Sequence, residues 1–138
     1  MKKKAIIISI KGFELTNKEK LLFTKESPWG LILFKRNIKS LPQVRLLIKN
    51  IKKITKDNKF PILIDEEGST VTRLNKIINH NIDANFFGKL YLSNKKMSIQ
   101  LYKNYLTVLC KNLRNIGINI NTIQVLDVLR KGTSKVIG

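Results

Sequence analysis

Three consecutive carboxylates stand out in a chain that is otherwise strongly basic. The acids are Asp65, Glu66 and Glu67, which follow the apolar run Phe60–Ile64 and precede Gly68. Because the chain has 9 acidic residues against 27 basic ones, three adjacent acids are conspicuous. α/β enzymes place polar groups at the carboxyl end of a buried strand in this way, and clustered carboxylates are candidate catalytic groups. This segment is therefore the first candidate for a functional site.

The elements that must position these acids include four short apolar runs, which predict strands. The first run is continuous and rich in β-branched residues, which is typical of a strand that is covered on both faces. The four predicted strands are Ala5–Ile10, Trp29–Phe34, Phe60–Ile64 and Ile118–Leu126.

Three segments between these runs predict helices. Thr16 and Glu19 have the spacing of a capping box, and Ser40 is followed three residues later by Gln43. Gly117 is a natural stop for the last helix. We expect the helices over 16–24, 40–56 and 95–116.

The apolar residues of the last helix predict which of its faces is buried. We expect that face to carry Leu101, Tyr105, Val108 and Leu109. The preceding stretch, Leu74–Asn94, is less regular but too apolar for a free linker. We expect it to pack over the sheet with one short helical turn.

The alternation of strands and helices predicts an α/β fold with a parallel sheet, whose carboxyl ends share one rim. Arg36 and Asn37 follow the second strand, Asp65 follows the third, and Asp127 follows the fourth. Charges at strand ends can bind a substrate, or they can simply terminate a strand and face water. We favour the second interpretation for Arg36 or Glu66 alone, and we weigh the two equally for Asp65 together with Asp127.

The composition limits the classes of protein to which the chain can belong. Hydrophobic residues make up 43% of it, which argues against disorder, and no apolar stretch is long enough for a membrane span. The net charge of +18 favours contact with nucleic acid, but the lysines are scattered, and AT-rich coding would produce the same bias. The single Cys110 and the absence of a convincing export signal predict a cytoplasmic protein.

Four motifs carry a resemblance to family 3 glycoside hydrolases. Gly30–Asn37 resembles their G-x-I-L-F-x-R-N segment, and Ile64–Arg73 resembles D-Q-E-G-G-R-V-Q-R. Gly117–Val128 is similar to G-I-N-x-N-x-x-P-V-L-D-V, and Val136–Gly138 is similar to the start of V-I-G-D-R-S-F. The closest branch is the cytosolic bacterial β-N-acetylhexosaminidase of peptidoglycan recycling.

This resemblance implies a (β/α)8 barrel of the TIM type that removes terminal β-linked N-acetylglucosamine from muropeptide-type glycans, with retention and without a metal or cofactor. It implies that Asp65 binds the hydroxyls of the terminal sugar and that Arg73 is a second substrate contact. Asp127 would support the site. Glu66 departs from the family pattern, in which glutamine is usual. His80 matches no family histidine, and we interpret it as a surface or packing residue.

The length of the chain bears on its activity. A complete barrel needs roughly 250 residues, whereas residues 1–138 supply about four strands. We therefore expect the N-terminal half of the barrel domain, truncated at its C-terminus. The resemblance places the nucleophile and the acid/base beyond Gly138, so this piece alone should be inactive.

Three other functions remain open at this point. The chain can be part of a family 3 β-glucosidase, a non-catalytic sugar-binding module, or a basic nucleic-acid-binding module.

Overall fold

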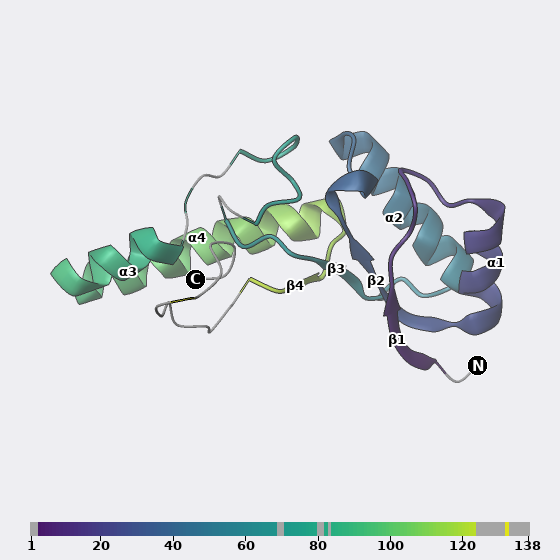
Figure 1. The fold of residues 1–138 in the computed structure, drawn as a ribbon, viewed down its shortest axis with the longest axis horizontal. Coiled ribbons are helices and arrows are strands. Elements are labelled where there is room, and N and C mark those ends of the chain that lie inside the picture. Colours follow the sequence, from purple (N-terminus) through teal and green to yellow (C-terminus); the bar gives the residue numbers. More distant parts are fainter. Residues whose placement is uncertain (1–2, 69–70, 80–81, 83, 124–131, 133–138) are drawn as a thin grey trace.

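The computed structural model describes residues 3–68, 71–79, 82, 84–123 and 132. Within them the chain forms a four-stranded parallel sheet with the strand order β1-β2-β3-β4 (Figure 1). The strands are β1 (Lys4–Ile8), β2 (Pro28–Leu33), β3 (Ile62–Ile64) and β4 (Ile120–Asn121). The helices are α1 (Asn17–Glu26), the 3-10 helix η1 (Lys35–Asn37), α2 (Leu41–Thr55), α3 (Ala84–Ser93) and α4 (Lys95–Ile116). The predicted α/β fold with parallel strands is confirmed.

The predicted N-caps of α1 and α2 and the predicted stop of α4 are confirmed by their hydrogen bonds, whereas α1 ends at Glu26, two residues later than predicted. The Glu19 N–H donates to Thr16 Oγ1 over 3.2 Å, and the Thr16 N–H donates to Glu19 Oε2 over 2.8 Å, which completes the capping box. At the start of α2 the Gln43 N–H donates to the Ser40 hydroxyl. Helix α4 covers the predicted residues and ends at Gly117, whose φ of 107° suits glycine.

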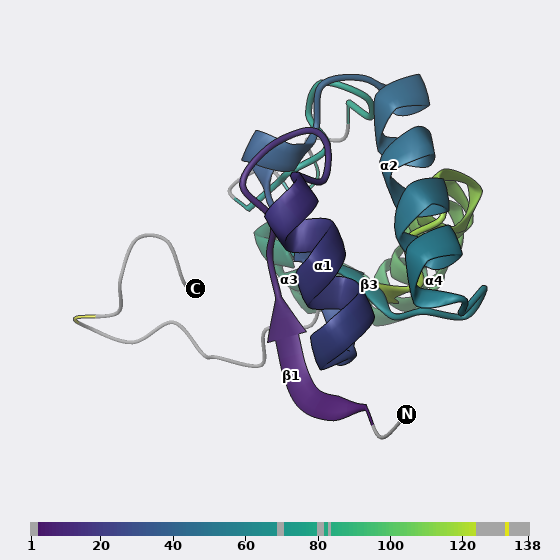
Figure 2. The same ribbon diagram turned by 90° about the vertical axis from the view of Figure 1, so that its right-hand side faces the viewer.

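The hydrophobic core lies between the sheet and a layer made of α1, α2 and α4. Helix α1 contacts α2, and α2 contacts α4, so the three helices are neighbours beside the sheet (Figures 1 and 2). The strands β2 and β3 are buried where they meet this layer. Their core side chains are Leu31, Leu33, Ile62 and Ile64, and those of the helices include Phe23, Val44, Ile51, Leu109 and Leu113.

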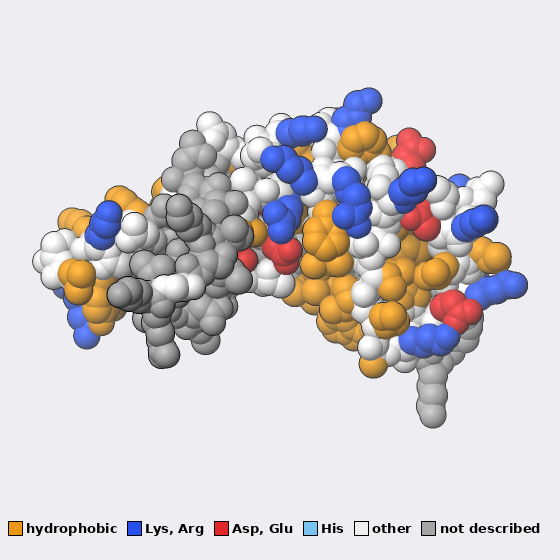
Figure 3. Space-filling view, viewed as in Figure 1, with side chains coloured by type: hydrophobic (Ala, Val, Ile, Leu, Met, Phe, Trp, Pro, Cys, Tyr) orange, Lys and Arg blue, Asp and Glu red, His pale blue; other side chains and the backbone are white. Residues whose placement is uncertain are grey.

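The prediction that the first strand is covered on both faces is wrong. Ile6 is 50% exposed and Ile7 is 43% exposed, and Trp29 of the neighbouring strand is also exposed. Figure 3 shows hydrophobic side chains gathered on the face of the molecule where β1 and β2 lie. The physical reason is that β1 is an edge of the described sheet, and an apolar run does not reveal whether a strand is central or at an edge.

The stretch before α4 matches its prediction only in part. Leu74 is buried in the core, and Ile77 and Ile78 pack against it, as predicted. The ten-residue helix α3 differs, because it packs against the N-terminal half of α4 and not over the sheet (Figure 1). The contact is aromatic, because the ring of Phe87 lies 4.8 Å from that of Tyr102 and 5.5 Å from that of Tyr105. Leu101 and Val108 are exposed, so the predicted buried face of α4 holds only in part.

Gly30 sets the distance between β2 and β3. A Cβ atom at this position would lie 3.1 Å from both Pro61 Cβ and Pro61 O, and 3.2 Å from Leu63 Cδ1. Backbone and ring atoms cannot give way cheaply, so a side chain would push the two central strands apart. The glycine is therefore required by close packing and not by its dihedral angles.

We expect Gly30→Ala to destabilise the protein by about 1–3 kcal/mol because it overpacks the centre of the sheet. Urea denaturation monitored by circular dichroism measures this loss. Gly12→Ala is the matched control, since a Cβ there would meet nothing within 4 Å. Equal stability of the two variants would contradict this account of Gly30.

Candidate functional site

Asp65 lies directly after β3 and is held by two neighbours. Its Oδ2 is 3.2 Å from the Arg73 Nη2, and its Oδ1 accepts a hydrogen bond of 2.9 Å from the Thr122 hydroxyl. The side chain is only 23% exposed. A carboxylate has about four acceptor positions, and these two partners leave acceptor positions unused. The geometry thus provides a fixed carboxylate that can still accept hydrogen bonds from a ligand.

Arg73 contributes the positive charge of this pair. Its Nε is buried and has no hydrogen-bond partner among the residues that the structure describes. A buried donor without a partner costs about 1–3 kcal/mol. Because this Nε is closed to solvent, a ligand can contact Arg73 only through the 27% of its side chain that is exposed.

Glu66 is completely buried, which contradicts the expectation that its charge faces water. Its carboxylate accepts hydrogen bonds from the Thr72 hydroxyl, from the Arg73 N–H over 2.7 Å and from the Leu74 N–H over 2.9 Å. The side chain thereby fixes the loop that carries Arg73. Sequence reasoning did not identify this role, because the same residue type at a strand end is usually solvated.

The side-chain amides of two asparagines extend the backbone hydrogen-bond ladder between β3 and β4. The Asn119 side chain accepts from the Ile62 N–H over 2.7 Å and donates to the Phe60 carbonyl over 3.0 Å. The Asn121 side chain accepts from the Glu66 N–H and donates to the Glu66 carbonyl, each over 3.0 Å. Their spacing of two residues places both amides on one side of the strand. That spacing was the available sequence signal for this role.

Arg36 and Asn37 support the same rim from the end of β2. Asn37 is fully buried, and its amide donates to the carbonyls of Ile10 and Gly12 over 3.0 Å and 2.9 Å. Arg36 is exposed, but its guanidinium donates to the Ile10 carbonyl over 3.1 Å and to the Ser9 hydroxyl over 2.8 Å. Both residues join the segment after β1 to the end of β2, so their role is structural.

Two residues singled out from the sequence lie outside the described residues. These are Asp127, expected to support the site, and His80, interpreted as a surface or packing residue. The site therefore rests on Asp65, Arg73 and their hydrogen-bonding neighbours.

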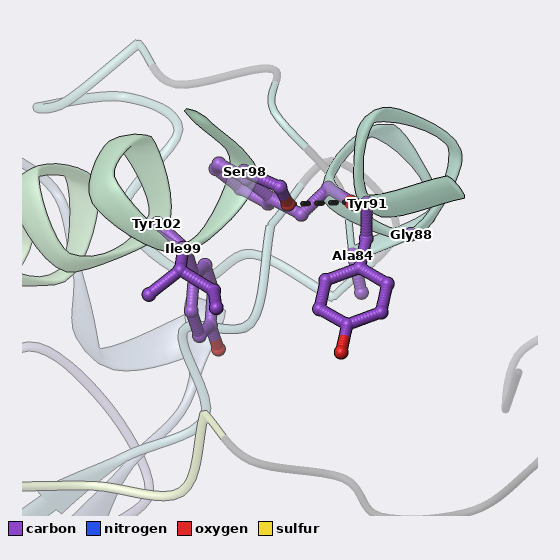
Figure 4. Close-up of a pocket in the computed structure, with 7 residues that line it drawn as sticks. Ala84, Gly88, Tyr91, Ser98, Ile99 and Tyr102 are labelled. Atoms are coloured by element: carbon purple, nitrogen blue, oxygen red, sulfur yellow. Dashed lines mark hydrogen bonds between the residues drawn. The ribbon is translucent and has the colours of Figure 1, made fainter. Parts of the chain in front are cut away.

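A separate hollow of about 270 Å³ lies between α3 and α4 (Figure 4). Its lining is Ala84, Phe87, Gly88, Tyr91, Ser98, Ile99 and Tyr102. The Ser98 hydroxyl donates to the Phe87 carbonyl over 2.8 Å, which ties the two helices together across it. None of the residues around Asp65 lines this hollow, and its apolar character indicates imperfect helix packing and not a sugar site.

Glu67 is the third acid of the cluster and the least well accommodated. Burial raises the pKa of its carboxyl above the ordinary glutamate value, and the charge of Asp65 raises this pKa further, while Arg73 acts in the opposite direction. The raised pKa means that the folded protein favours the protonated form of Glu67. Ionisation of Glu67 therefore lowers stability as the pH rises.

We expect Glu67→Gln to raise the thermal midpoint at pH 7, where the wild-type carboxylate is ionised. At about pH 3 both proteins carry a neutral side chain, so the difference should disappear. Thermal melts at the two pH values test this. Glu14→Gln, at an exposed position, controls for the loss of one negative charge. If Glu67→Gln is no more stable than Glu14→Gln at pH 7, burial of Glu67 does not have the expected effect on stability.

The chain was compared with known proteins. It is 30% identical over 133 residues to a β-hexosaminidase of Thioalkalivibrio sulfidiphilus, and the match covers 96% of this chain and 38% of that protein. No family model matches the chain. The chain thus spans about 38% of the length of this relative.

Solved structures agree with this relationship. NagZ from Neisseria gonorrhoeae, in complex with N-trifluoroacetyl-D-glucosamine, is 27% identical with a TM-score of 0.81, over 91% of this chain and 37% of that one. A glycoside hydrolase family 3 β-N-acetylglucosaminidase from Paenibacillus is 26% identical with a TM-score of 0.78, over 88% of this chain and 23% of that one. No helix in the described part of the chain is long and apolar enough to span a membrane. The resemblance carried by the sequence motifs is therefore confirmed: the chain is similar, over nearly its whole length, to the N-terminal portion of the family 3 β-hexosaminidases.

Proposed function

We propose that Asp65 and Arg73 bind a terminal N-acetylglucosamine, and that the intact enzyme hydrolyses this sugar from peptidoglycan-derived glycans such as muropeptides. The observation that carries the proposal is the ion pair of 3.2 Å at the carboxyl end of β3, the rim at which parallel-barrel enzymes assemble their sites. The sugar analogue named for the related Neisseria structure supports the class of ligand.

The chemistry of the pair suits a sugar. Two neighbouring hydroxyls of a pyranose can both donate to the unused acceptor positions of Asp65, and such charge-assisted bonds fix the orientation of the ring. Arg73, whose side chain is 27% exposed, can donate to a sugar oxygen at the same time. Because Arg73 also neutralises Asp65, the site holds a neutral sugar without accumulating negative charge.

Hydrolysis of the glycosidic bond needs catalytic groups in addition to the residues that bind the sugar. Retaining hydrolysis needs a nucleophile and an acid/base on opposite sides of the glycosidic bond. In the described cluster Asp65 is paired with Arg73 and Glu66 is buried under a loop, so neither is placed for this task. We infer that residues 1–138 are the N-terminal part of the barrel domain and supply one wall of the sugar site, with Asp127 as a supporting residue.

The cytoplasmic location stays a prediction, as does catalysis without a metal or cofactor.

Asp65→Ala tests the sugar-binding role in an intact barrel, made by joining this chain to the remaining portion of the Thioalkalivibrio relative. We expect kcat/KM for a chromogenic β-N-acetylglucosaminide to fall about 10²- to 10⁴-fold, because two bonds to a charged group at about 1.5–3 kcal/mol each are lost. Asp57→Ala is the control, since Asp57 pairs with Lys3 and holds a turn instead. Unchanged kinetics of Asp65→Ala would remove Asp65 from the site.

The second test uses the 138-residue chain alone with the same chromogenic substrate. We expect no turnover above the buffer rate, because retaining hydrolysis needs a nucleophile and an acid/base, and among the described acids neither Asp65 nor Glu66 is placed for these tasks. The joined barrel serves as the positive control. Turnover by the isolated chain, abolished by Asp65→Ala, would show that the account of the missing groups is wrong.

A further inference from the structure

We propose that Glu66 is a positioning residue of the Asp65–Arg73 pair. Its buried carboxylate fixes the main chain around Arg73 and thereby directs the guanidinium to Asp65. The inference rests on the proposed function only for the identity of the ligand that the pair binds.

The carboxylate of Glu66 gathers three donors from consecutive residues. Its Oε2 accepts from the Arg73 N–H over 2.7 Å and from the Leu74 N–H over 2.9 Å, while its Oε1 accepts from the Thr72 hydroxyl. Arg73 is the central residue of the three. Because charge-assisted hydrogen bonds in a buried site are strong and directional, this contact defines where the Arg73 side chain begins.

The main chain of Glu66 is fixed independently of its side chain. Asn121 bonds to both its N–H and its carbonyl, each over 3.0 Å. Asp65 is the preceding residue, and it is held by Thr122, the residue after Asn121. The two members of the ion pair are therefore placed by one connected set of bonds, in which Glu66 links the end of β4 to the loop that carries Arg73.

The bonding pattern predicts which substitution preserves this function. In Glu66→Gln the amide oxygen can replace Oε2 and accept both backbone N–H groups. The amide nitrogen can then replace Oε1 and donate to the Thr72 hydroxyl, which can act as an acceptor as well as a donor. The geometry therefore predicts that glutamine can replace Glu66 in holding the loop.

The experiment measures the position of Arg73 without a ligand. In the ¹⁵N-labelled 138-residue chain, the Nε–H signal of Arg73 is assigned by its loss in Arg73→Lys, since the chain has only five arginines. We expect Glu66→Gln to keep the wild-type signal. We expect Glu66→Ala to move it toward its position in Asp65→Ala, while the melt remains cooperative. An unmoved signal in Glu66→Ala, or an equal shift in Glu66→Gln, would overturn the proposal.

A second set of variants covers the case in which Glu66→Ala does not fold. Thr72→Val removes one donor at nearly constant volume and should also shift the Arg73 signal. Asn121→Ala should shift it too, whereas Asn119→Ala, which removes two equivalent bonds at the other end of β3, should not. An Arg73 signal that stays unchanged in both Thr72→Val and Asn121→Ala would equally overturn the proposal.

Titration with N-acetylglucosamine separates this inference from the proposed function. If the wild-type chain binds the sugar, Glu66→Ala should weaken binding about tenfold, as the loss of one well-placed charged contact implies, and Glu66→Gln should restore it. When Glu66→Ala and Glu66→Gln are equally stable, a purely structural role of Glu66 predicts equal sugar binding by the two variants. Binding that is restored in Glu66→Gln alone therefore supports the positioning role. If the wild-type chain alone binds no sugar, the kinetics of Asp65→Ala in the joined barrel still test the proposed function, and the Arg73 signal still decides the role of Glu66.

Discussion

The attachment of β4 to β3 is the constraint on which the rest of the site depends. The ladder between these strands is short, and the amides of Asn119 and Asn121 extend it by bonding to the backbone of Phe60, Ile62 and Glu66. A side-chain amide presents a donor and an acceptor with the same spacing as a peptide group, so it can continue a ladder where the main chain turns away. Without this attachment, Thr122 would not reach Asp65.

The three adjacent acids at the carboxyl end of β3 differ in their surroundings. Of the three adjacent acids, Asp65 keeps acceptor positions that no described residue uses, Glu66 is used within the protein, and Glu67 is protonated more readily than an ordinary glutamate. Three side chains of nearly the same chemistry thus behave differently because each has a different set of neighbours. This explains how a cluster that resembles catalytic carboxylates can contain one acid that shapes a loop, Glu66, beside the acid for which we propose sugar binding, Asp65.

Local patterns predicted the fold well, and long-range contacts account for what they missed. The Thr16 capping box and the stop at Gly117 are decided by residues close in sequence, so the helix ends could be predicted. The exposure of β1 and the contact of α3 with α4 depend on which elements lie alongside, which periodicity does not encode. The burial of Glu66 was missed for the same reason, because its donors lie six to eight residues away in an irregular loop.

The exposed apolar face of β1 has a consequence for how the molecules behave in solution. The net charge of +18 makes two copies repel each other in dilute buffer, and this repulsion opposes contact between their bare strands. Added salt shortens the range of that repulsion to about 10 Å at 0.1 M, while it leaves the attraction between apolar surfaces intact. The many lysines, whatever their origin in the composition of the chain, therefore act as a colloidal barrier whose height is set by ionic strength.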